Sequence, residues 1–494
     1  EGEKIMFDYK TPEKCGVSSE KILEVLKIFD SYKLSTHSVL MAKGDSVIAE
    51  GYYEPIGKGF LHRMYSVSKS FVSMAVGLAY TEGLLSLDDT ILSHLPEYEK
   101  EDTDEYFKSV TIRNMLSMQS NVNRFSPWWG LFSDRTEAYY TNTTGQIPGT
   151  LFAYDSMGSA LLGNIVERLT GKTFLDYLKD SFLLEMGFSK ESYTLYEPGG
   201  HTVGDSGIIC TAKDLLIFSR FILNKGMYNG RQIIDRAFME ESVKVQSDNN
   251  LSPDITAFNT SGYGYLIWKT HDSGFSLIGM GDQLAICDEE KDFIFVITSD
   301  NQGSASSRHI IFHEVLKHLI PSIKNEALPE NPTAYNELSE YLSSRKLFTA
   351  EGKKNSETAK KVSGVTYRLS ENTLKMEDIT LTLYDKEGKF TFTKEGKIFT
   401  IPFGLCENKP IDFSLGMRTH KTCMGKNEEG AFSAVASGAW SEKDKFSIKM
   451  QIIDNYFGQV VIHLYFKDDE VSLVIRKSGQ YVLDGFSGYA IGHK

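Results

Sequence analysis

The sequence lacks an uninterrupted apolar run approaching the roughly 18 residues that a membrane-spanning helix needs, so no transmembrane segment is predicted. It also lacks an excess of positive charge, because 53 lysines and arginines stand against 66 aspartates and glutamates and the formal net charge is -13. Binding to nucleic acid requires a basic face that neutralises phosphates, so no nucleic-acid partner is expected. The charge balance favours a small substrate that is not a polyanion, or another protein.

Signatures of metal sites and disulfides are also missing. The five cysteines include no Cys-x-x-Cys pair, and the eleven histidines form no His-Glu-x-x-His motif. These absences predict free thiols, no zinc site and no disulfide framework. Neither a metal nor another cofactor is therefore expected.

What is present is a chain of globular composition. Its 494 residues, 41% hydrophobic and 24% charged, are enough for two or three domains. Two apolar runs around the turn Lys43–Ser46 predict a β-hairpin. Apolar residues at helical spacing between Ser66 and Glu82, followed by Gly83, predict a buried helix that begins with serine.

The order of the further patterns predicts an α+β fold for the first part of the chain. Helical patterns broken by polar loops come first, and strand patterns return in "GYGYLIWKT", "FSLIGMGDQLAIC" and "DFIFVITSD", before the helical "SRHIIFHEVLKHLI". Strands at both ends with helices between them indicate an antiparallel sheet flanked by helices, together with a helical lobe. A cleft between the sheet and the lobe is the expected place for a site.

Three segments are expected along the chain. Residues 1–325 form the α+β domain, and residues 326–360 form a linker with a short helix, because prolines and polar residues cluster near Pro321–Tyr335. In residues 361–494, apolar and polar residues alternate between turns, as in "TLTLYDKEGKFTFTKEGKIFTIPF". This alternation predicts a separate, mostly antiparallel β domain that is barrel- or sandwich-like, and the pattern does not indicate its role.

A Ser-x-x-Lys pattern occurs three times, at Ser18–Lys21, Ser66–Lys69 and Ser343–Lys346. On a helix, its two side chains lie one turn apart and can face the same cleft. At Ser66, the positive potential of the helix N-terminus favours an ionised hydroxyl, and the Lys69 amine can accept or relay the serine proton. The alternative is that Ser66 only caps the helix and Lys69 is a solvated surface charge. For the other two copies, which lie in plain amphipathic helices, that alternative is favoured.

Four segments support the chemical interpretation of Ser66. They read "HRMYSVSKSFVSMAVGLAYTEGLLSLDDTILSHLPEY", "VTIRNMLSMQSNV", "IPGTLFAYDSMGSALLGNIVERLTG" and "DSGIICTAKDLLIFSRFIL". In this order they resemble the serine β-lactamase-like and penicillin-binding-protein-like hydrolases, whose signatures include Ser-x-x-Lys. The resemblance extends from near residue 15 to near residue 320. It is to the class C β-lactamase branch, with its esterases, D-amino-acid peptidases and 6-aminohexanoate-oligomer hydrolases.

The resemblance implies roles for several residues. Ser66 would be the nucleophile and Lys69 its partner, and Tyr154, in "FAYDSMG", would be the general base where the family has a Tyr-x-Asn motif. Ser156 replaces the family's usual asparagine, and its hydroxyl can bond Lys69 or a substrate amide with one donor instead of two. Without the resemblance, Tyr154 would be a half-buried core tyrosine.

The family's third motif, Lys-Thr-Gly or His-x-Gly on an edge strand, has its best counterpart in Gly279–Gln283, "GMGDQ". Gly279 and Gly281 suit a close approach of substrate to the strand backbone. The oxyanion would be held by the N–H groups of Ser66 and of a residue near Asp282. The motif's cation is missing, which argues against an efficient β-lactamase or D-Ala-D-Ala carboxypeptidase, because that charge helps to hold a substrate carboxylate. The alternative for this segment is a strand bulge.

A second serine motif carries no such support. Gly204–Gly207, "GDSG", imitates the nucleophile loop of trypsin-like proteases, but Ile208 follows where glycine belongs and no matching histidine segment precedes it. The segment is therefore interpreted as a glycine-containing turn before a helix.

The expected function is that of a serine hydrolase that cleaves an ester or amide bond of a small molecule or peptide through a Ser66 acyl-enzyme. The enzymatic alternative is a peptidoglycan-related D-peptidase or a weak β-lactamase. The alternative of another class is a catalytically silent binding or sensor protein on the same scaffold. The resemblance favours the cell envelope or secretion, although no targeting segment is recognised, and the sequence does not indicate an oligomeric state.

Overall fold

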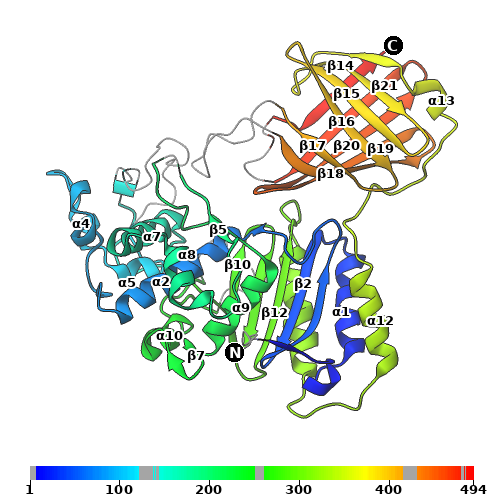
Figure 1. The fold of residues 1–494 in the computed structure, drawn as a ribbon. Coiled ribbons are helices and arrows are strands. Elements are labelled where there is room, and N and C mark those ends of the chain that lie inside the picture. Colours follow the sequence, from blue (N-terminus) through cyan, green and yellow to red (C-terminus); the bar gives the residue numbers. More distant parts are fainter. Residues whose placement is uncertain are drawn as a thin grey trace. The chain divides into compact units, whose positions relative to one another are not determined.

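The computed structural model describes residues 7–121, 137, 139–140, 144–197, 199–250, 261–415, 431–479, 483 and 485–494. These residues form two compact units, and the chain passes from the first to the second between Lys346 and Leu347 (Figure 1). The first unit combines a sheet with helices, and the second is built almost wholly of strands. The boundary falls inside residues 326–360, the segment predicted to link two domains.

A seven-stranded sheet forms the centre of the first unit. Its strands lie in the order β1-β3-β2-β12-β11-β10-β9, and every neighbouring pair is antiparallel except β1 and β3. The predicted hairpin is present as β2 and β3, and the late strand β12 pairs with β2, so the two ends of this unit share one sheet. The bounds are β1 Asp8–Tyr9, β2 Thr36–Lys43, β3 Ser46–Tyr52, β9 Trp268–His271, β10 Gly274–Gly279, β11 Gln283–Asp288 and β12 Phe293–Ser299.

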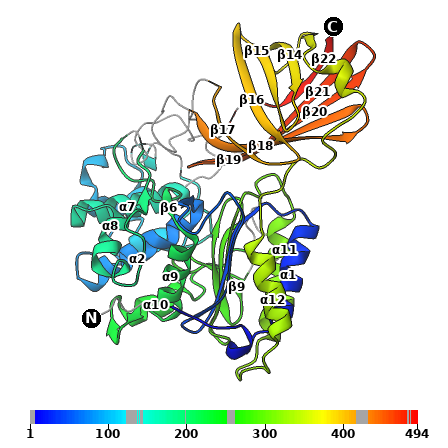
Figure 2. The same cartoon turned by 45° about the vertical axis from the view of Figure 1, so that its right-hand side comes forward.

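Three helices cover one face of this sheet: α1 (Ser19–Ser31), α11 (Ser307–His313) and α12 (Pro332–Ser343) (Figure 2). α11 continues directly into a π-helix, Glu314–Leu319. α1 contacts both α12 and the π-helix, and α12 contacts β3. The expected short helix of the linker segment is therefore α12, and it packs within the first unit.

The opposite face carries α9 (Ala212–Leu223), which contacts β2, β11 and β12, and beyond it the helical lobe. The predicted helix between Ser66 and Glu82 is α2 (Ser68–Thr81), and the lobe is organised around it: α2 contacts α7 (Ser156–Thr170), α8 (Phe174–Leu178) and α10 (Arg236–Ser242). Phe71 of α2 stacks on Phe218 of α9 with ring centroids 3.5 Å apart, which joins the lobe to the sheet.

Shorter elements complete the first unit, and no helix in the described ranges is long and apolar enough to cross a bilayer. The helices are α3 Ile91–His94, α4 Glu105–Ser109, α5 Ile112–Leu116, the 3₁₀ turns Glu13–Cys15, Tyr65–Val67, Pro96–Tyr98 and Ile320–Ser322, and the π-helix Lys179–Leu183. The strands are β4 His62–Arg63, β5 Tyr193–Thr194, β6 Ile208–Cys210, β7 Met227–Tyr228 and β8 Arg231–Gln232.

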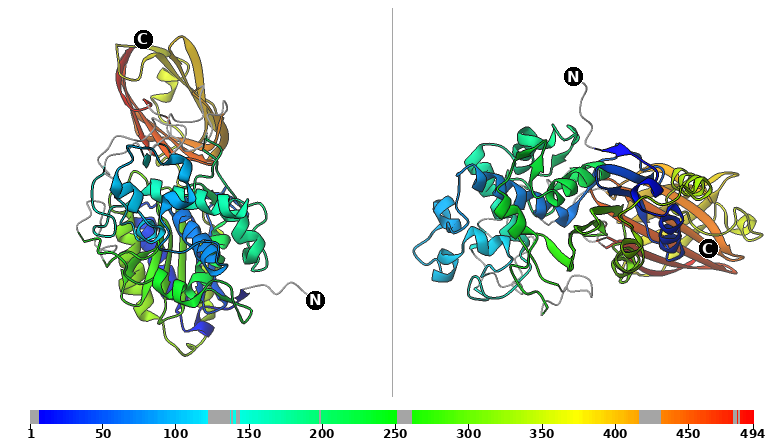
Figure 3. Two further views of the ribbon diagram at one scale, coloured as in Figure 1. Left: turned by 90° about the vertical axis from the view of Figure 1, so that its left-hand side faces the viewer. Right: turned by 90° about the horizontal axis from the view of Figure 1, so that it is seen from below.

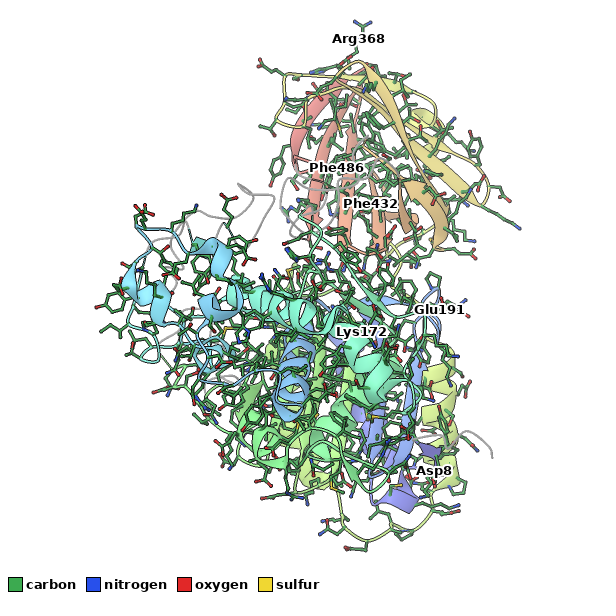
Figure 4. The ribbon with its side chains drawn as sticks, turned by 60° about the vertical axis from the view of Figure 1, so that its left-hand side comes forward. Asp8, Lys172, Glu191, Arg368, Phe432 and Phe486 are labelled. Carbon is green, nitrogen blue, oxygen red and sulfur yellow. The ribbon has the colours of Figure 1, made fainter. Side chains whose placement is uncertain are left out.

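The second unit is a closed barrel of nine strands (Figure 3). Strands β16-β15-β14-β13-β22-β21-β20-β19-β18 pair antiparallel in that order, a parallel pairing of β16 with β18 closes the ring, and β17 pairs with β18 outside it. Phe432 and Phe486 are buried in this unit, whereas Arg368 is exposed (Figure 4). Of the two expected architectures, a barrel or a sandwich, the barrel is therefore present. The bounds are α13 Ala359–Val362, β13 Thr366–Leu369, β14 Met376–Leu383, β15 Glu387–Lys394, β16 Lys397–Leu405, β17 Lys409–Phe413, β18 Phe432–Glu442, β19 Lys445–Ile453, β20 Phe457–Lys467, β21 Glu470–Ser478 and β22 Gly488–His493.

A carboxylate on β3 is held at the outer edge of the sheet of the first unit. Glu50 accepts hydrogen bonds from the hydroxyls of Tyr9 (2.6 Å) and Tyr52 (2.8 Å), and the Lys58 ammonium lies 3.1 Å from it. Burial works to raise the pKa of Glu50, but these three donors outweigh it and hold the pKa below the usual 4.5.

We expect Glu50→Gln to lower the free energy of unfolding by about 1–2 kcal/mol at pH 7, because hydrogen bonds to a half-buried charge are lost. Since the pKa is lower in the folded chain, this contribution is present above pH 4.5 and is lost as the pH falls through the folded-state pKa. Thermal unfolding of the parent and of Glu50→Gln would therefore show a difference in Tm that is smaller at acidic than at neutral pH. The exposed Glu326→Gln is the control. A Tm difference between the parent and Glu50→Gln of equal size at both pH values would contradict the prediction.

Candidate active site

Ser66 lies in the 3₁₀ turn Tyr65–Val67, immediately before α2. The preceding Tyr65 has φ +46°, a left-handed conformation that is unusual for a bulky residue and is often found at functional sites. The N-cap position of α2 is Val67, and no side chain caps this helix end. The Ser66 hydroxyl therefore does not act as the cap of α2. Because Ser66 is half-buried, its hydroxyl is also not fully solvated.

Lys69 is buried and joins the elements of the site. Only 1% of its surface is exposed, which excludes the solvated surface charge considered as an alternative. Its Nζ donates to Ser66 Oγ at 3.2 Å and to the backbone oxygen of Asp205 at 2.9 Å. The same Nζ lies 4.9 Å from the centroid of the Tyr154 ring, a cation–π distance. The spacing of Ser66 and Lys69 thus places both groups in one site, together with Tyr154.

The turn Gly204–Gly207 holds this lysine. Asp205 O accepts from Lys69, Ser206 O accepts from the buried Arg63 Nε at 3.0 Å, and the N–H of Ile208 donates to Ser68 Oγ at 3.0 Å. The segment interpreted as an ordinary turn therefore orders the nucleophile helix. Its contribution is made by backbone atoms, so the residue types carry no signal that sequence reasoning could use.

Tyr154 is positioned by the residue that follows it. Asp155 is the N-cap of α7, where its carboxylate accepts from the N–H of Gly158 at 2.9 Å and from Ser120 Oγ at 2.8 Å. Burial raises the pKa of Asp155, while these hydrogen bonds and the nearby charge of Lys69 oppose the rise. A buried and hydrogen-bonded helix cap thus fixes the backbone next to Tyr154.

Aromatic side chains surround Tyr154. Its ring stacks on Trp268 of β9, with centroids 5.6 Å apart and planes 22° apart, and meets Tyr263 edge-on at 6.5 Å. Phe152 packs against the same two rings. Burial raises the pKa of Tyr263 well above its usual value, so this hydroxyl stays protonated. In the sequence, Tyr263 and Trp268 stand out only as part of a strand pattern, because no local pattern connects them to Tyr154.

The proposed third motif forms the turn between β10 and β11, where a strand bulge was the alternative. Gly279 ends β10, Gly281 has φ +75°, and Gln283 begins β11. A Cβ atom on Gly279 would lie 2.3 Å from the backbone oxygen of Met64, two residues before Ser66. The strand therefore approaches the nucleophile turn so closely that only glycine fits there.

Asp282 is held by α11 on the same turn. Its carboxylate accepts from Ser307 Oγ at 2.5 Å and from Arg308 Nε at 3.0 Å, and its own N–H donates to Gly279 O at 3.2 Å. Arg308 Nη2 also lies 3.3 Å from Gly279 O. A cation does lie against this turn, although it comes from a distant helix and its charge is compensated by Asp282.

Three other serines considered in the sequence, Ser156, Ser18 and Ser343, make no hydrogen bond to Lys69 among the described residues. Ser156 is the first residue of α7 and is half-buried. Ser18 caps α1, and Ser343 ends α12 with its hydroxyl bonded to Glu340 O, so both have plain helical roles. A cavity of about 640 Å³ lined by β1, β3 and α12 contains none of the predicted site residues.

We expect Gly279→Ala to push β10 away from the nucleophile turn, because the added methyl group would overlap Met64 O. The rate at which a fluorophosphonate labels Ser66 should fall by about tenfold or more, since small displacements of reacting groups have large kinetic effects. Gly57→Ala is the matched control, because a Cβ there meets nothing within 4 Å. Equal labelling rates of the two variants would show that this approach is not needed.

Relatives of the chain include a hydrolase and penicillin-binding proteins. The 6-aminohexanoate-dimer hydrolase of Paenarthrobacter ureafaciens is 22% identical over 267 residues, which cover 50% of this chain and 67% of that protein. Penicillin-binding protein 4 of Amycolatopsis lactamdurans is 26% identical over 273 residues, covering 46% and 70%. A solved structure from Bacillus anthracis, described as a candidate 6-aminohexanoate-dimer hydrolase, has a TM-score of 0.51 and 18% identity, and the match covers 66% of this chain and 89% of that one. This structural likeness shows a shared fold.

The family model described as Beta-lactamase matches residues 25–319, more than half of the chain. The match includes Ser66, Lys69, Tyr154 and the turn that begins at Gly279. Family and relatives together indicate a hydrolase of the serine β-lactamase and penicillin-binding-protein superfamily. The chain belongs to the Beta-lactamase family.

Proposed function

We propose that the first unit cleaves an ester or amide bond through an acyl-enzyme on Ser66. The observation that carries this proposal is the position of the buried Lys69 Nζ, 3.2 Å from Ser66 Oγ and 4.9 Å from the centre of the Tyr154 ring. The nucleophile and the ring of a candidate base thus lie beside the same buried amine, which supports general-base activation of the serine.

In the acylation step, Ser66 Oγ attacks the carbonyl carbon while Tyr154, supported by Lys69, takes the hydroxyl proton. The bond to the leaving group breaks, and the proton passes to the departing alkoxide or amine. Water then gives a proton to the same pair and attacks the acyl carbon. The bond from the acyl carbon to Ser66 Oγ breaks, the acid leaves and the proton returns to Ser66 Oγ.

The oxyanion formed in each step requires backbone donors. The N–H of Ser66 lies in the first turn of a helical segment, where N–H groups have no partner within the helix. Since the N–H of Asp282 donates to Gly279 O, we assign the second donor to Met280 or Gly281 of the same turn. Such donors typically lower the barrier by about 3–4 kcal/mol.

The substrate class follows from the walls of the site. Phe152, Tyr263 and Trp268 make the side next to Tyr154 aromatic, and Asp282 compensates the charge of Arg308. Both features favour an ester or amide whose acyl or leaving group is apolar and carries no carboxylate at this turn. The relative named as a 6-aminohexanoate-dimer hydrolase supports an amide as one bond that could be cleaved.

A second candidate, a D-peptidase or weak β-lactamase, is favoured by one observation. The Arg308 guanidinium lies beside Gly279 O, where a substrate carboxylate could compete with Asp282 for it. The relative named penicillin-binding protein 4 is compatible with this candidate.

We expect a burst of nitrophenol from short-chain nitrophenyl esters that equals one product per chain. Ser66→Ala should remove the burst and lower turnover by at least about 10⁴-fold, because it deletes the nucleophile. Tyr154→Phe should lower turnover by about 10²–10⁴-fold, the usual contribution of a general base. Ser343→Ala, in another Ser-x-x-Lys pattern, is the matched control and should behave as the parent. If no ester reacts and a fluorophosphonate fails to label Ser66, the chain is a silent binding protein.

A panel of an ester, an anilide and a cephalosporin separates the two enzymatic candidates. We expect kcat/KM to be highest for the ester and the cephalosporin to be barely turned over. The reason is that the Arg308 guanidinium is already paired with Asp282 and is not available to a substrate carboxylate. Arg308→Gln should then leave ester turnover within about threefold of the parent. Efficient cephalosporin turnover that is lost in Arg308→Gln would instead establish the second candidate.

A further inference from the structure

A change from α-helix to π-helix brings two histidines that are five residues apart in the sequence together on the surface of the first unit. α11 ends at His313 and continues without interruption as the π-helix Glu314–Leu319. In an α-helix, residues five apart differ by about 140° around the axis and face different sides. In a π-helix the hydrogen bonds run from residue i to i+5, so residues five apart lie one turn apart. His313 and His318 therefore become neighbours.

Three potential ligand groups converge at this turn. The ring centroids of His313 and His318 are 5.0 Å apart, and His313 Nδ1 lies 3.1 Å from Glu314 Oε1. One ligand atom from each of the three residues lies within 4.8 Å of the other two. His313 and His318 are exposed, and Glu314 is partly buried beside them. Two imidazoles and one carboxylate are thus present around one point.

We propose that His313, Glu314 and His318 bind a divalent transition-metal ion of the Zn²⁺ type. Zn²⁺ binds imidazole nitrogen and carboxylate oxygen at about 2.0–2.2 Å, so tetrahedral ligands lie about 3.4 Å from one another. The ligand atoms lie within 4.8 Å of one another, and rotations of the exposed His313 and His318 side chains can shorten this spacing. Imidazole ligands favour zinc, copper and nickel over magnesium and calcium, and water completes the coordination.

The backbone that presents these ligands is fixed from its other side. Val315 and Leu319 of the π-helix are fully buried, and the π-helix packs against α1. The His313 and His318 side chains are exposed, and the main chain that carries them is already in place before an ion binds. Preorganisation of this kind lowers the cost of binding.

The metal site is separate from the chemistry proposed for Ser66. Ser307 and Arg308, at the start of α11, hold Asp282 beside the nucleophile turn, whereas His313 and His318 lie at the end of α11 and in the π-helix. An ion bound there stabilises the folded chain, since the unfolded chain does not bring the three ligands together. It supplies no group to the acyl-enzyme reaction.

Isothermal titration of the full chain with Zn²⁺, after dialysis against EDTA, tests the proposal. We expect one site that His313→Gln and His318→Gln each weaken by at least about tenfold, because each removes one of three ligands. His493→Gln is the matched control. Among the described residues, His493 lies 3.2 Å from Glu470 as an exposed pair outside any group of three potential ligands, so its loss should not change the affinity. Zn²⁺ should raise Tm of the parent and of this control but not of His318→Gln.

Cobalt spectroscopy separates this site from the cysteine thiols. Co²⁺ bound by nitrogen and oxygen gives visible bands without the near-ultraviolet charge-transfer band of a thiolate ligand, and His318→Gln should remove those bands. Glu314→Gln gives an independent ligand variant if a histidine variant fails to fold. EDTA should leave the labelling rate of Ser66 unchanged. Zinc binding of equal affinity in the parent and in the double variant His313→Gln/His318→Gln would overturn the proposal.

Discussion

The buried charge of Lys69 is the constraint on which the rest of the site depends. An ammonium with 1% exposure is tolerated only if its protons find acceptors and its charge finds compensation, because an unpaired buried charge costs several kcal/mol. Ser66 Oγ and Asp205 O accept its hydrogen bonds, the Tyr154 ring faces it, and Asp155 lies near enough to interact with its charge. These partners come from three separate segments, so the lysine is stable only when the nucleophile turn, the turn at Asp205 and the start of α7 have assembled around it.

The fold meets this constraint by close packing at two places. Phe71 of α2 stacks on Phe218 of α9, which fixes the nucleophile helix against the helix that covers the sheet. Gly279, at the end of β10, brings the strand backbone against Met64 O, which fixes the nucleophile turn against the end of this strand. A side chain at that position would separate the two, so the missing Cβ is a requirement of the site. The hydrolytic chemistry proposed here thus depends on steric fit as much as on charge.

Much of the fold follows from local patterns in the sequence. Alternation and turn residues predicted the β2–β3 hairpin, helical spacing predicted α2, and regular alternation after residue 361 predicted the second unit. Barrel closure was beyond such reasoning, because it depends on the pairing of β16 with β18, whose residues Gly404 and Ser437 have no local relation. The π-helix after His313 was not predictable from local patterns either. With α-helical spacing, His313 and His318 would face different sides of the helix and would not be recognised as a pair of ligands.

The sequence by itself determined the spacing of Ser66 and Lys69, because a helical turn is a local structure whose geometry depends on neighbouring residues alone. Together with the family resemblance it also indicated Tyr154 and the Gly279 turn as candidates. Only the tertiary structure decided that Lys69 is buried, that Asp205 O is its second acceptor and that Trp268 stacks on Tyr154. It likewise placed Arg308 against a turn whose own sequence contains no cation. The physical reason is that burial, backbone acceptors and ring stacking are contacts between segments far apart in the chain, and packing of the whole unit sets them.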